Sequence, residues 1–219
     1  MRHYLSKYID HTNLATDANA ADIEQLCHEA KKYELAAVCV NPLWVKTAAE
    51  HLNGWDIAVC SVVGFPTGAH LPAIKVAEAR QALADGATEI DTVIDVATLK
   101  SRDIDGVRAD IEPLAELVHE QGAILKVILE VALLEDEEII RGCRWAEEFG
   151  ADYIKTSTGM LKGENSGATV EAVQLMRESV RPETGIKAAG GIRDRATAET
   201  MIEAGATRLG TSSSTEIVT

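Results

Sequence analysis

Eight short apolar runs, rich in β-branched residues, alternate along the 219-residue chain with longer segments of helical periodicity. Such a run is typical of a strand buried on both faces, and a helical segment between two of them favours parallel pairing. Eight is the number of strands that closes a parallel sheet into a barrel. The candidate strands are Tyr8–Asn13, Ala36–Val40, Ile57–Gly64, Glu89–Val96, Ile124–Glu130, Tyr153–Thr156, Gly185–Ala189 and Thr207–Thr211. The pattern predicts an α/β fold, a (β/α)8 TIM barrel.

The segments between these runs carry apolar residues at the spacing of one helix face. Ile23, Leu26, Cys27 and Ala30 follow the i, i+3, i+4, i+7 rule, and a similar stripe covers residues 104–118, where Pro113 should start, kink or break a helix. Gly-Ala pairs stand between a helical segment and a strand at several places, among them Gly86-Ala87, Gly150-Ala151 and Gly205-Ala206. Glycine suits the left-handed residue that ends a helix, so each pair marks a helix-to-strand corner. No linker divides the chain, and we expect one domain over residues 1–219.

Charged residues interrupt several of the apolar runs. Strand side chains alternate between faces, so outward-facing Ile90 and Ile94 would direct Asp91 and Asp95 into the barrel. The same alternation turns Lys126, Glu130, Lys155 and Lys187 inward. Buried charges cost several kcal/mol each unless they are paired, so three acids and three lysines inside one barrel indicate a chemical role more strongly than a set of neutralising salt bridges.

The lysines suggest the kind of chemistry. A lysine beside other cations in a partly desolvated site loses its proton more readily, and a neutral amine attacks a carbonyl to form a Schiff base. That adduct withdraws electrons from the adjacent C–C bond. Asp91 or Glu130 could move the protons that carbinolamine dehydration and enamine formation require. Spacing alone does not decide which lysine is the nucleophile.

Two glycine-rich segments follow the seventh and eighth candidate strands: 188–193, Ala-Ala-Gly-Gly-Ile-Arg, and 209–214, Leu-Gly-Thr-Ser-Ser-Ser. Barrel enzymes often hold phosphate at these positions with loop amides and a helix N-terminus. Glycine lets the backbone approach the ligand, and serine adds hydroxyl donors. Together the two segments predict a phosphate site, although Gly-Gly alone is commonly a turn.

Composition and charge restrict the classes of partner that the protein can bind. The formal net charge of −14 disfavours binding to nucleic acid or to an anionic membrane, and main-chain amides would hold an anionic substrate without basic surface. Four widely spaced cysteines and six histidines lack metal-ligand spacing, so we expect no metal site and reduced core cysteines. No secretory or membrane-spanning stretch is visible, which predicts a cytoplasmic protein. Only five residues follow Ser214, and a homo-oligomer in which a partner covers that edge is one hypothesis.

Seven segments resemble the deoxyribose-phosphate aldolase family, in order and over nearly the whole chain. They are Ile9–Thr12, Ala37–Pro42, Val63–Gly68, Glu89–Asp91, Leu125–Glu130, Tyr153–Gly159 and Ile186–Arg193, of which Ile154–Gly159 with Lys187 downstream is the most specific. The resemblance implies a carbon–carbon lyase without a cofactor. It would cleave 2-deoxy-D-ribose 5-phosphate reversibly to D-glyceraldehyde 3-phosphate and acetaldehyde, in deoxyribose phosphate catabolism.

The resemblance also implies roles for single residues. Lys155 would be the Schiff-base nucleophile, Lys187 would favour its neutral form and join the proton relay, and Asp91 would be the acid/base partner. Asp10 and Lys126 would complete the polar network, with Cys39 lining the site. Phosphate would contact Gly159, Gly190, Gly191, Arg193, Gly210, Ser212 and Ser213.

Four positions depart from the family pattern: Val131, Asp95, Ala97 and Met160. Asp95 adds an acid near the lysines, and Met160 supplies no cation for phosphate. Two other functions remain open. One is a different lysine aldolase, transaldolase-like or acting on keto-deoxy sugar acids, and the other is a sugar-phosphate-binding barrel without turnover.

Overall fold

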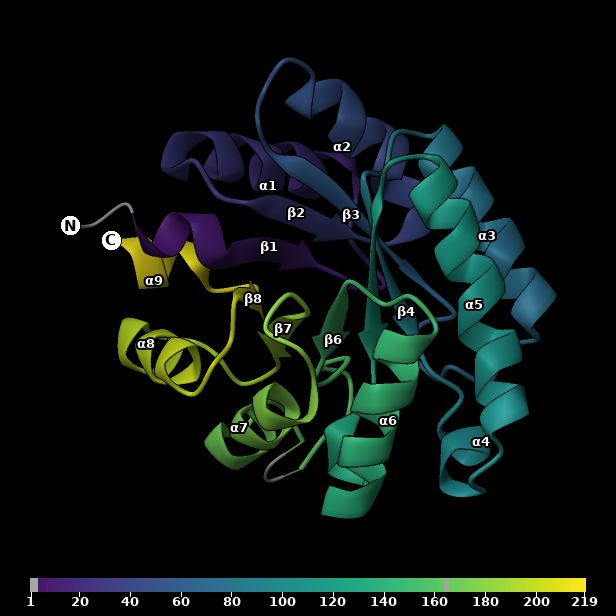
Figure 1. The fold of residues 1–219 in the computed structure, drawn as a ribbon. Coiled ribbons are helices and arrows are strands. Elements are labelled where there is room, and N and C mark those ends of the chain that lie inside the picture. Colours follow the sequence, from purple (N-terminus) through teal and green to yellow (C-terminus); the bar gives the residue numbers. More distant parts are fainter. Residues whose placement is uncertain (1–3, 164–165) are drawn as a thin grey trace.

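Eight parallel strands close into one barrel at the centre of the molecule, with helices around it (Figure 1). The computed structural model describes residues 4–163 and 166–219. The strands are β1 (Ile9–Asn13), β2 (Ala37–Val40), β3 (Ala58–Val63), β4 (Glu89–Val93), β5 (Ile124–Ile128), β6 (Tyr153–Lys155), β7 (Gly185–Ala189) and β8 (Arg208–Thr211). Each strand pairs in parallel with the next, and β1 pairs with β8. The predicted (β/α)8 barrel is confirmed.

Helices follow the strands and cover the outside of the barrel. They are α1 (Ala20–Tyr33), α2 (Val45–Leu52), α3 (Pro72–Ala84), α4 (Val96–Lys100), α5 (Ile104–Glu120), α6 (Asp136–Glu148), α7 (Val170–Ser179), α8 (Arg195–Glu203) and α9 (Ser214–Val218), with short 3-10 turns η1 (Leu5–Tyr8), η2 (Pro42–Trp44) and η3 (Val131–Leu133). The last helix is short, as expected, but its buried Ile217 and Val218 still close the edge beside α1, α8 and η1. None of the helices in the described ranges is long and apolar enough to cross a bilayer.

The main hydrophobic core is the layer between strands and helices. Outward-facing strand residues such as Val38, Ile90, Leu125, Ile154 and Ile186 are fully buried in it. They pack against the apolar faces of the surrounding helices, as the alternation predicted. Because outward positions carry the apolar side chains, the inward positions are free to carry charge.

The Gly-Ala pairs at 86–87, 150–151 and 205–206 form the predicted helix-to-strand corners. Gly86, Gly150 and Gly205 all have positive φ, between 102° and 114°. At Gly86 a Cβ atom would also lie only 2.7 Å from the Cβ of Ala49. Glycine is therefore required there both by the backbone conformation and by the close approach of the neighbouring helix.

The prediction for Asp95 was wrong. The fourth strand ends at Val93, and Val96 begins α4 instead of extending the strand. The Asp95 carboxylate accepts hydrogen bonds from the N–H groups of Ala97 and Thr98 and from the Thr98 hydroxyl. It caps helix α4, because its carboxylate satisfies N–H groups of the first turn that have no partner within the helix.

A second difference concerns Pro113, which neither starts nor ends a helix. Helix α5 runs through it from Ile104 to Glu120. On either side of the proline, Ile111, Leu114 and Val118 are fully buried against the barrel. This continuous apolar stripe stabilises the helix enough to outweigh the one backbone hydrogen bond that proline cannot donate.

Candidate functional site

The barrel lumen holds a cluster of ion pairs centred on Asp91. Oδ2 of Asp91 lies 2.8 Å from the ammonium nitrogen of Lys155 and 2.7 Å from that of Lys187, and Oδ1 lies 2.8 Å from that of Lys126. These side chains are at most 3% exposed. Strand register explains the arrangement, because Asp91 pairs with Lys126 across β4 and β5, and Lys155 with Lys187 across β6 and β7.

A second layer of charge lies beside this cluster. Asp10, from β1, forms an ion pair with Lys187, and Glu89 lies 2.5 Å from Lys126. Arg208, at the start of β8, reaches Oδ1 of Asp10 at 2.7 Å and Oε1 of Glu89 at 3.3 Å. Sequence reasoning missed Glu89 and Arg208, although each stands two residues before an inward position and strand alternation could have found them.

The charges hold one another in their ionised forms. Burial by itself would raise the pKa of Asp91, but Lys126, Lys155 and Lys187 outweigh it and hold that pKa well below its ordinary range. Burial likewise would lower the pKa of Lys126 and Lys187. Nearby carboxylates, Asp91 foremost for Lys126 and Asp10 for Lys187, raise both instead. Lys126 and Lys187 are therefore protonated at neutral pH.

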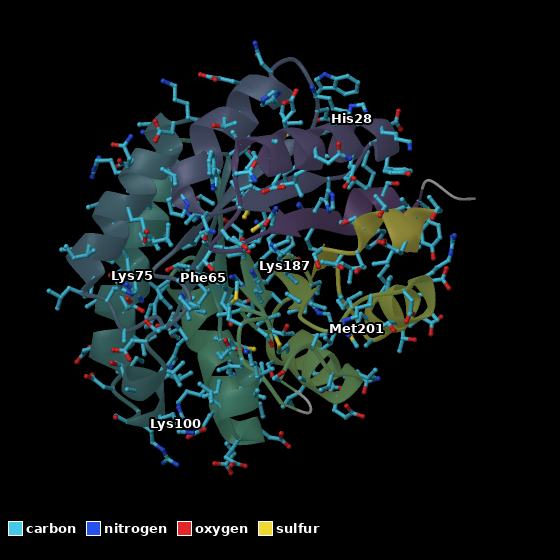
Figure 2. All side chains as sticks on the ribbon, turned by 180° about the vertical axis from the view of Figure 1, so that it is seen from behind. His28, Phe65, Lys75, Lys100, Lys187 and Met201 are labelled. Carbon is cyan, nitrogen blue, oxygen red and sulfur yellow. The ribbon has the colours of Figure 1, made fainter. Side chains whose placement is uncertain are left out.

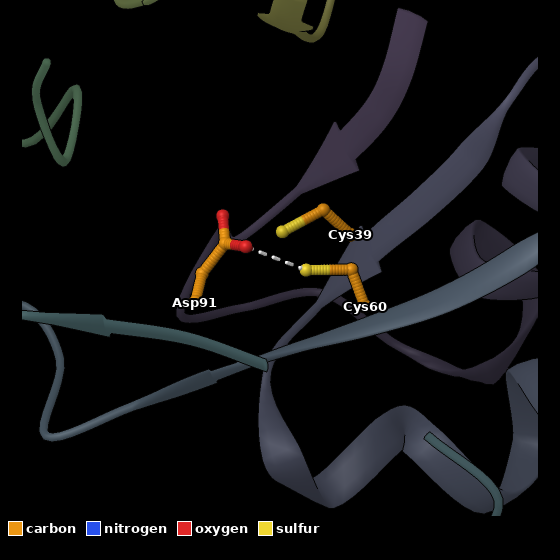
Figure 3. Close-up of side chains that lie close together, drawn as sticks. All are labelled: Cys39, Cys60 and Asp91. Carbon is orange, nitrogen blue, oxygen red and sulfur yellow. Dashed lines mark hydrogen bonds between the residues drawn. The ribbon is translucent and has the colours of Figure 1, made fainter. Parts of the chain in front are cut away.

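The opposite wall of the lumen is apolar. Cys39 and Cys60 are register partners on β2 and β3, and they form a buried cluster with Leu14 and Val62, against which Phe65 packs. Figure 3 shows the two thiols beside Asp91, with the Sγ of Cys60 3.0 Å from Oδ1 of the carboxylate. Burial raises the pKa of the Cys60 thiol well above its ordinary value, so Cys60 remains a neutral hydrogen-bond donor.

Two sets of side chains bring possible metal-ligand atoms within 4.8 Å of one another: Cys39, Cys60 and Asp91, and Asp10, Cys60 and Glu89. The ammonium of Lys126 contacts members of both sets, at 3.4 Å from the Cys60 sulfur, 2.8 Å from Asp91 and 2.5 Å from Glu89. A lysine thus already supplies the positive charge that a cation would bring to this position.

A cavity of about 630 Å³ opens above the cluster, at the carboxyl ends of the strands. Of the lysines in the described part of the chain, Lys155 alone lines it. Its other walls come from helix α1, from the carboxyl ends of β1, β7 and β8, and from the loops after β1, β6, β7 and β8. They include His11, Glu29, Gly159, Gly190, Gly191, Arg193, Gly210 and Ser212. At Gly190 a Cβ would lie 2.9 Å from the Cα of Gly167, so only glycine allows the two loops to pack this closely.

Glu130 occupies a different place from the other inward charges. It has a left-handed backbone, with φ of 58°, and its buried carboxylate accepts hydrogen bonds from the N–H and hydroxyl of Thr158. Burial raises its pKa. Thr158 and Gly159 both line the cavity, so these hydrogen bonds to Glu130 hold the loop that follows β6. Among the described contacts, Glu130 makes no ion pair with the lysines.

The sequence-predicted site residues fall into three groups. Asp10, Asp91, Lys126, Lys155 and Lys187 meet in the lumen. Gly159, Gly190, Gly191, Arg193, Gly210 and Ser212 line the cavity. Cys39 lies fully buried in the apolar wall of the lumen, with its thiol beside Asp91, but does not line the cavity. Ser213 does neither, and its N–H is directed to the hydroxyl of Thr211.

Comparison with known proteins agrees with this geometry. The family model described as DeoC/LacD family aldolase matches residues 4–214. A deoxyribose-phosphate aldolase of Geobacillus sp. (strain WCH70) is 51% identical over 218 residues, which span 100% of this chain and 96% of the relative. One from Thermococcus gammatolerans is 54% identical over 216 residues, 98% of this chain and 95% of the relative.

A solved structure shows the same fold. It is described as the unique tetrameric structure of deoxyribose phosphate aldolase from Aeropyrum pernix. It superposes with a TM-score of 0.91 at 30% sequence identity, covering 100% of this chain and 91% of that one. Family model, sequence relatives and solved structure point to the same conclusion: this chain belongs to the DeoC/LacD family of aldolases.

Proposed function

We propose that this chain is a class I aldolase that reversibly cleaves 2-deoxy-D-ribose 5-phosphate to D-glyceraldehyde 3-phosphate and acetaldehyde through a Schiff base on Lys155. Family membership and relatives named for this activity support the reaction. The observation that carries the residue assignment is the position of Lys155. It shares one oxygen of Asp91 with Lys187, yet it alone of the three lysines lines the cavity.

Imine formation uses the groups around Lys155. Its neutral amine attacks the C1 aldehyde of the open-chain sugar, and the carbinolamine then loses water to give an iminium ion. The protonated Lys187 ammonium, 2.7 Å from Asp91, donates the proton that the departing hydroxyl needs. Asp91, ionised at neutral pH, accepts protons, and its Oδ2 holds the side-chain nitrogens of Lys155 and Lys187 close to each other.

Bond cleavage follows from the iminium. A base removes the proton of the C3 hydroxyl, the C2–C3 bond breaks, and its electron pair moves to C2 to form an enamine with the former iminium. The three-carbon fragment leaves as D-glyceraldehyde 3-phosphate. Protonation of C2 and hydrolysis of the resulting imine then release acetaldehyde and restore the free amine.

The phosphate would bind in the glycine-rich wall of the cavity. Gly190 and Gly191 both have positive φ, and with Gly210 and Ser212 they border the side of the cavity formed by β7 and β8. Main-chain N–H groups and hydroxyls bind an anion without net positive surface, which suits a chain with a net charge of −14. Arg193 is the one arginine in the described cavity wall.

Two further expectations belong to this proposal. We propose a cytoplasmic location, in keeping with a phosphorylated substrate, and a homo-oligomer, in keeping with the tetramer named for the Aeropyrum pernix protein. The absence of a nucleic-acid partner stays a prediction from the net charge.

A donor-specific imine trap tests the function. The protein is incubated with sodium borohydride and acetaldehyde, dihydroxyacetone or pyruvate, and the modified residue is identified by peptide mass spectrometry. We expect reduction of an acetaldehyde adduct onto Lys155 and little reaction with the other two donors. An adduct on Lys126 or Lys187 would overturn the role assignment. Preference for another donor would indicate a different lysine aldolase, and no adduct at all would indicate a binding protein.

A further inference from the structure

Arg208 lies beneath the reacting lysines and takes no direct part in the proposed reaction. Its guanidinium bonds to Oδ1 of Asp10 at 2.7 Å and approaches Glu89, and its central carbon lies 5.6 Å from the ring centroid of Tyr153. The side chain is only 12% exposed. Arg208 does not line the cavity, so it acts on the chemistry only through its neighbours.

Counted over residues 4–163 and 166–219, the ion-paired network in the lumen carries more positive than negative groups. Its carboxylates are Asp10, Glu89 and Asp91, and its cations are Lys126, Lys155, Lys187 and Arg208. Three negative charges therefore oppose four positive ones. Arginine keeps its proton under all ordinary conditions, so among these four cations only a lysine can lose a proton and relieve the excess.

Of the three lysines, one is placed so that it would lose its proton first. Lys126 contacts both Glu89 and Asp91, and Lys187 contacts both Asp10 and Asp91. Among the described carboxylates Lys155 forms an ion pair with Asp91 alone, through an oxygen that Lys187 also uses, and it borders the open cavity. The amine with the fewest carboxylate contacts is thus the one that the excess charge affects most.

We propose that Arg208 is a positioning residue for imine formation: it supplies the fourth positive charge of the lumen and so makes the proton of Lys155 the easiest to remove. Without Arg208, three carboxylates would balance three lysines and each lysine would keep its proton more firmly. Glu89 acts in the opposite direction, because its negative charge offsets Arg208 and Lys126. The inference rests on the proposed imine chemistry of Lys155.

Every strand of the barrel carries a charged or titratable group on the side of the lumen in which Lys155 lies. Inside the barrel they are Asp10 (β1), Cys39 (β2), Cys60 (β3), Glu89 and Asp91 (β4), Lys126 and, just past the strand, Glu130 (β5), Tyr153 (β6), Lys187 (β7) and Arg208 (β8). At the cavity they are His11, Asp22, Glu29 and Arg193. Glu130 is directed to Thr158 and His11 to Glu29 and Ser214, so neither joins the ion-paired network.

The test measures imine trapping as a function of pH, with acetaldehyde as the substrate because it does not titrate, and cyanoborohydride as the reductant. In a medium of effective dielectric constant about 20, a unit charge at a distance on the order of 10 Å shifts the pKa of an amine by about one pH unit. We expect Arg208→Gln to move the acidic limb of the trapping rate upward by about that much. Glu89→Gln should move it downward by a similar amount.

Matched variants separate charge from shape. Arg208→Lys keeps the charge and should leave the limb near its wild-type position, and the double variant R208Q/E89Q removes one charge of each sign and should return it there. If R208Q does not fold, as judged by circular dichroism, the downward shift of E89Q and its reversal in the double variant still decide the question. Shifts in the same direction, or none, would overturn the role of Arg208. A wild-type protein that forms no adduct at any pH would instead overturn the proposed function.

Discussion

Two buried lysines, Lys75 and Lys155, contact aspartates in different regions of this molecule with different consequences. Lys75 lies in the helix layer, where its ammonium contacts both oxygens of Asp110, at 2.6 and 2.8 Å, and the carbonyl of Val93 at 2.7 Å. Lys155 lies in the lumen, 2.8 Å from Asp91. Figure 2 marks the contrast in position, with Lys75 beside the outer helices and Lys187, the register partner of Lys155, near the centre.

Charge balance and access distinguish the two sites. Lys75 is fully buried and has a carboxylate to itself, and the N–H of Asp95 satisfies Oδ2 of Asp110 as well. Lys155 shares its carboxylate with two other lysines and borders a cavity. Burial of a lysine therefore does not by itself indicate catalysis. An excess of positive charge together with access to a substrate does.

Loss of Lys155 should have the largest effect. We expect Lys155→Ala to reduce cleavage by about 10⁴-fold or more, because no other amine of the described residues borders the cavity to form the imine. The fold should persist, since Asp91 keeps its contacts with Lys126 and Lys187. Steady-state kinetics and circular dichroism check both statements. Substantial remaining activity in a folded variant would reject the mechanism.

Loss of Lys75 should act on stability. Lys75→Met leaves the buried Asp110 without its cation and should lower the free energy of unfolding by about 3–5 kcal/mol. The double variant K75M/D110L removes both charges and should recover most of that loss. Urea unfolding measures the stability, and kcat of the folded protein should change little. A fall in kcat comparable to that of Lys155→Ala would erase the distinction between the two sites.

Asp10 in the lumen and Asp110 in the helix layer should change the free energy of unfolding in opposite directions as the pH falls. Burial alone would raise the pKa of Asp10, but Lys187, Lys126 and Arg208 lower it to about 2. Its folded pKa is below the unfolded value of about 4, so its contribution of about 2 kcal/mol is present above pH 4 and is lost as the pH falls toward 2. For Asp110, burial outweighs the ion pair with Lys75 and raises the pKa above that of the unfolded chain. The folded protein therefore binds this proton more tightly. The stabilisation from the protonated carboxyl is present at low pH and is lost as the pH rises through the raised pKa.

Unfolding by urea across a series of acidic pH values checks this difference. Asp10→Asn should make the loss of stability between pH 4 and pH 2 shallower than in the wild type. Asp110→Asn should not, because the titration of Asp110 opposes that loss. An unchanged slope in the Asp10 variant would mean that Asp10 is not held ionised by the lumen cations.

Strand alternation predicted much of the site because the period of two depends on local backbone geometry alone. It placed Asp91, Lys126, Lys155 and Lys187 on the inner face, and their contacts agree. It failed at Asp95, since a strand run does not show where the strand stops and a cap begins. Alternation also gives Arg208 an inward direction, but an arginine at the start of a strand resembles an exposed strand end. Only the tertiary structure shows that Asp10 of β1 and Glu89 of β4 lie beside it.

The sequence by itself determined the number and order of the strands, the helix-to-strand corners and the inward direction of the lysines, because each depends on local periodicity or backbone conformation. Tertiary structure alone decided which lysine faces the cavity, how three carboxylates are divided among four cations, and which loop Glu130 holds. These features arise where different strands meet. Ion pairing depends on distances of a few ångströms between residues far apart in the chain, and closure of the barrel sets those distances.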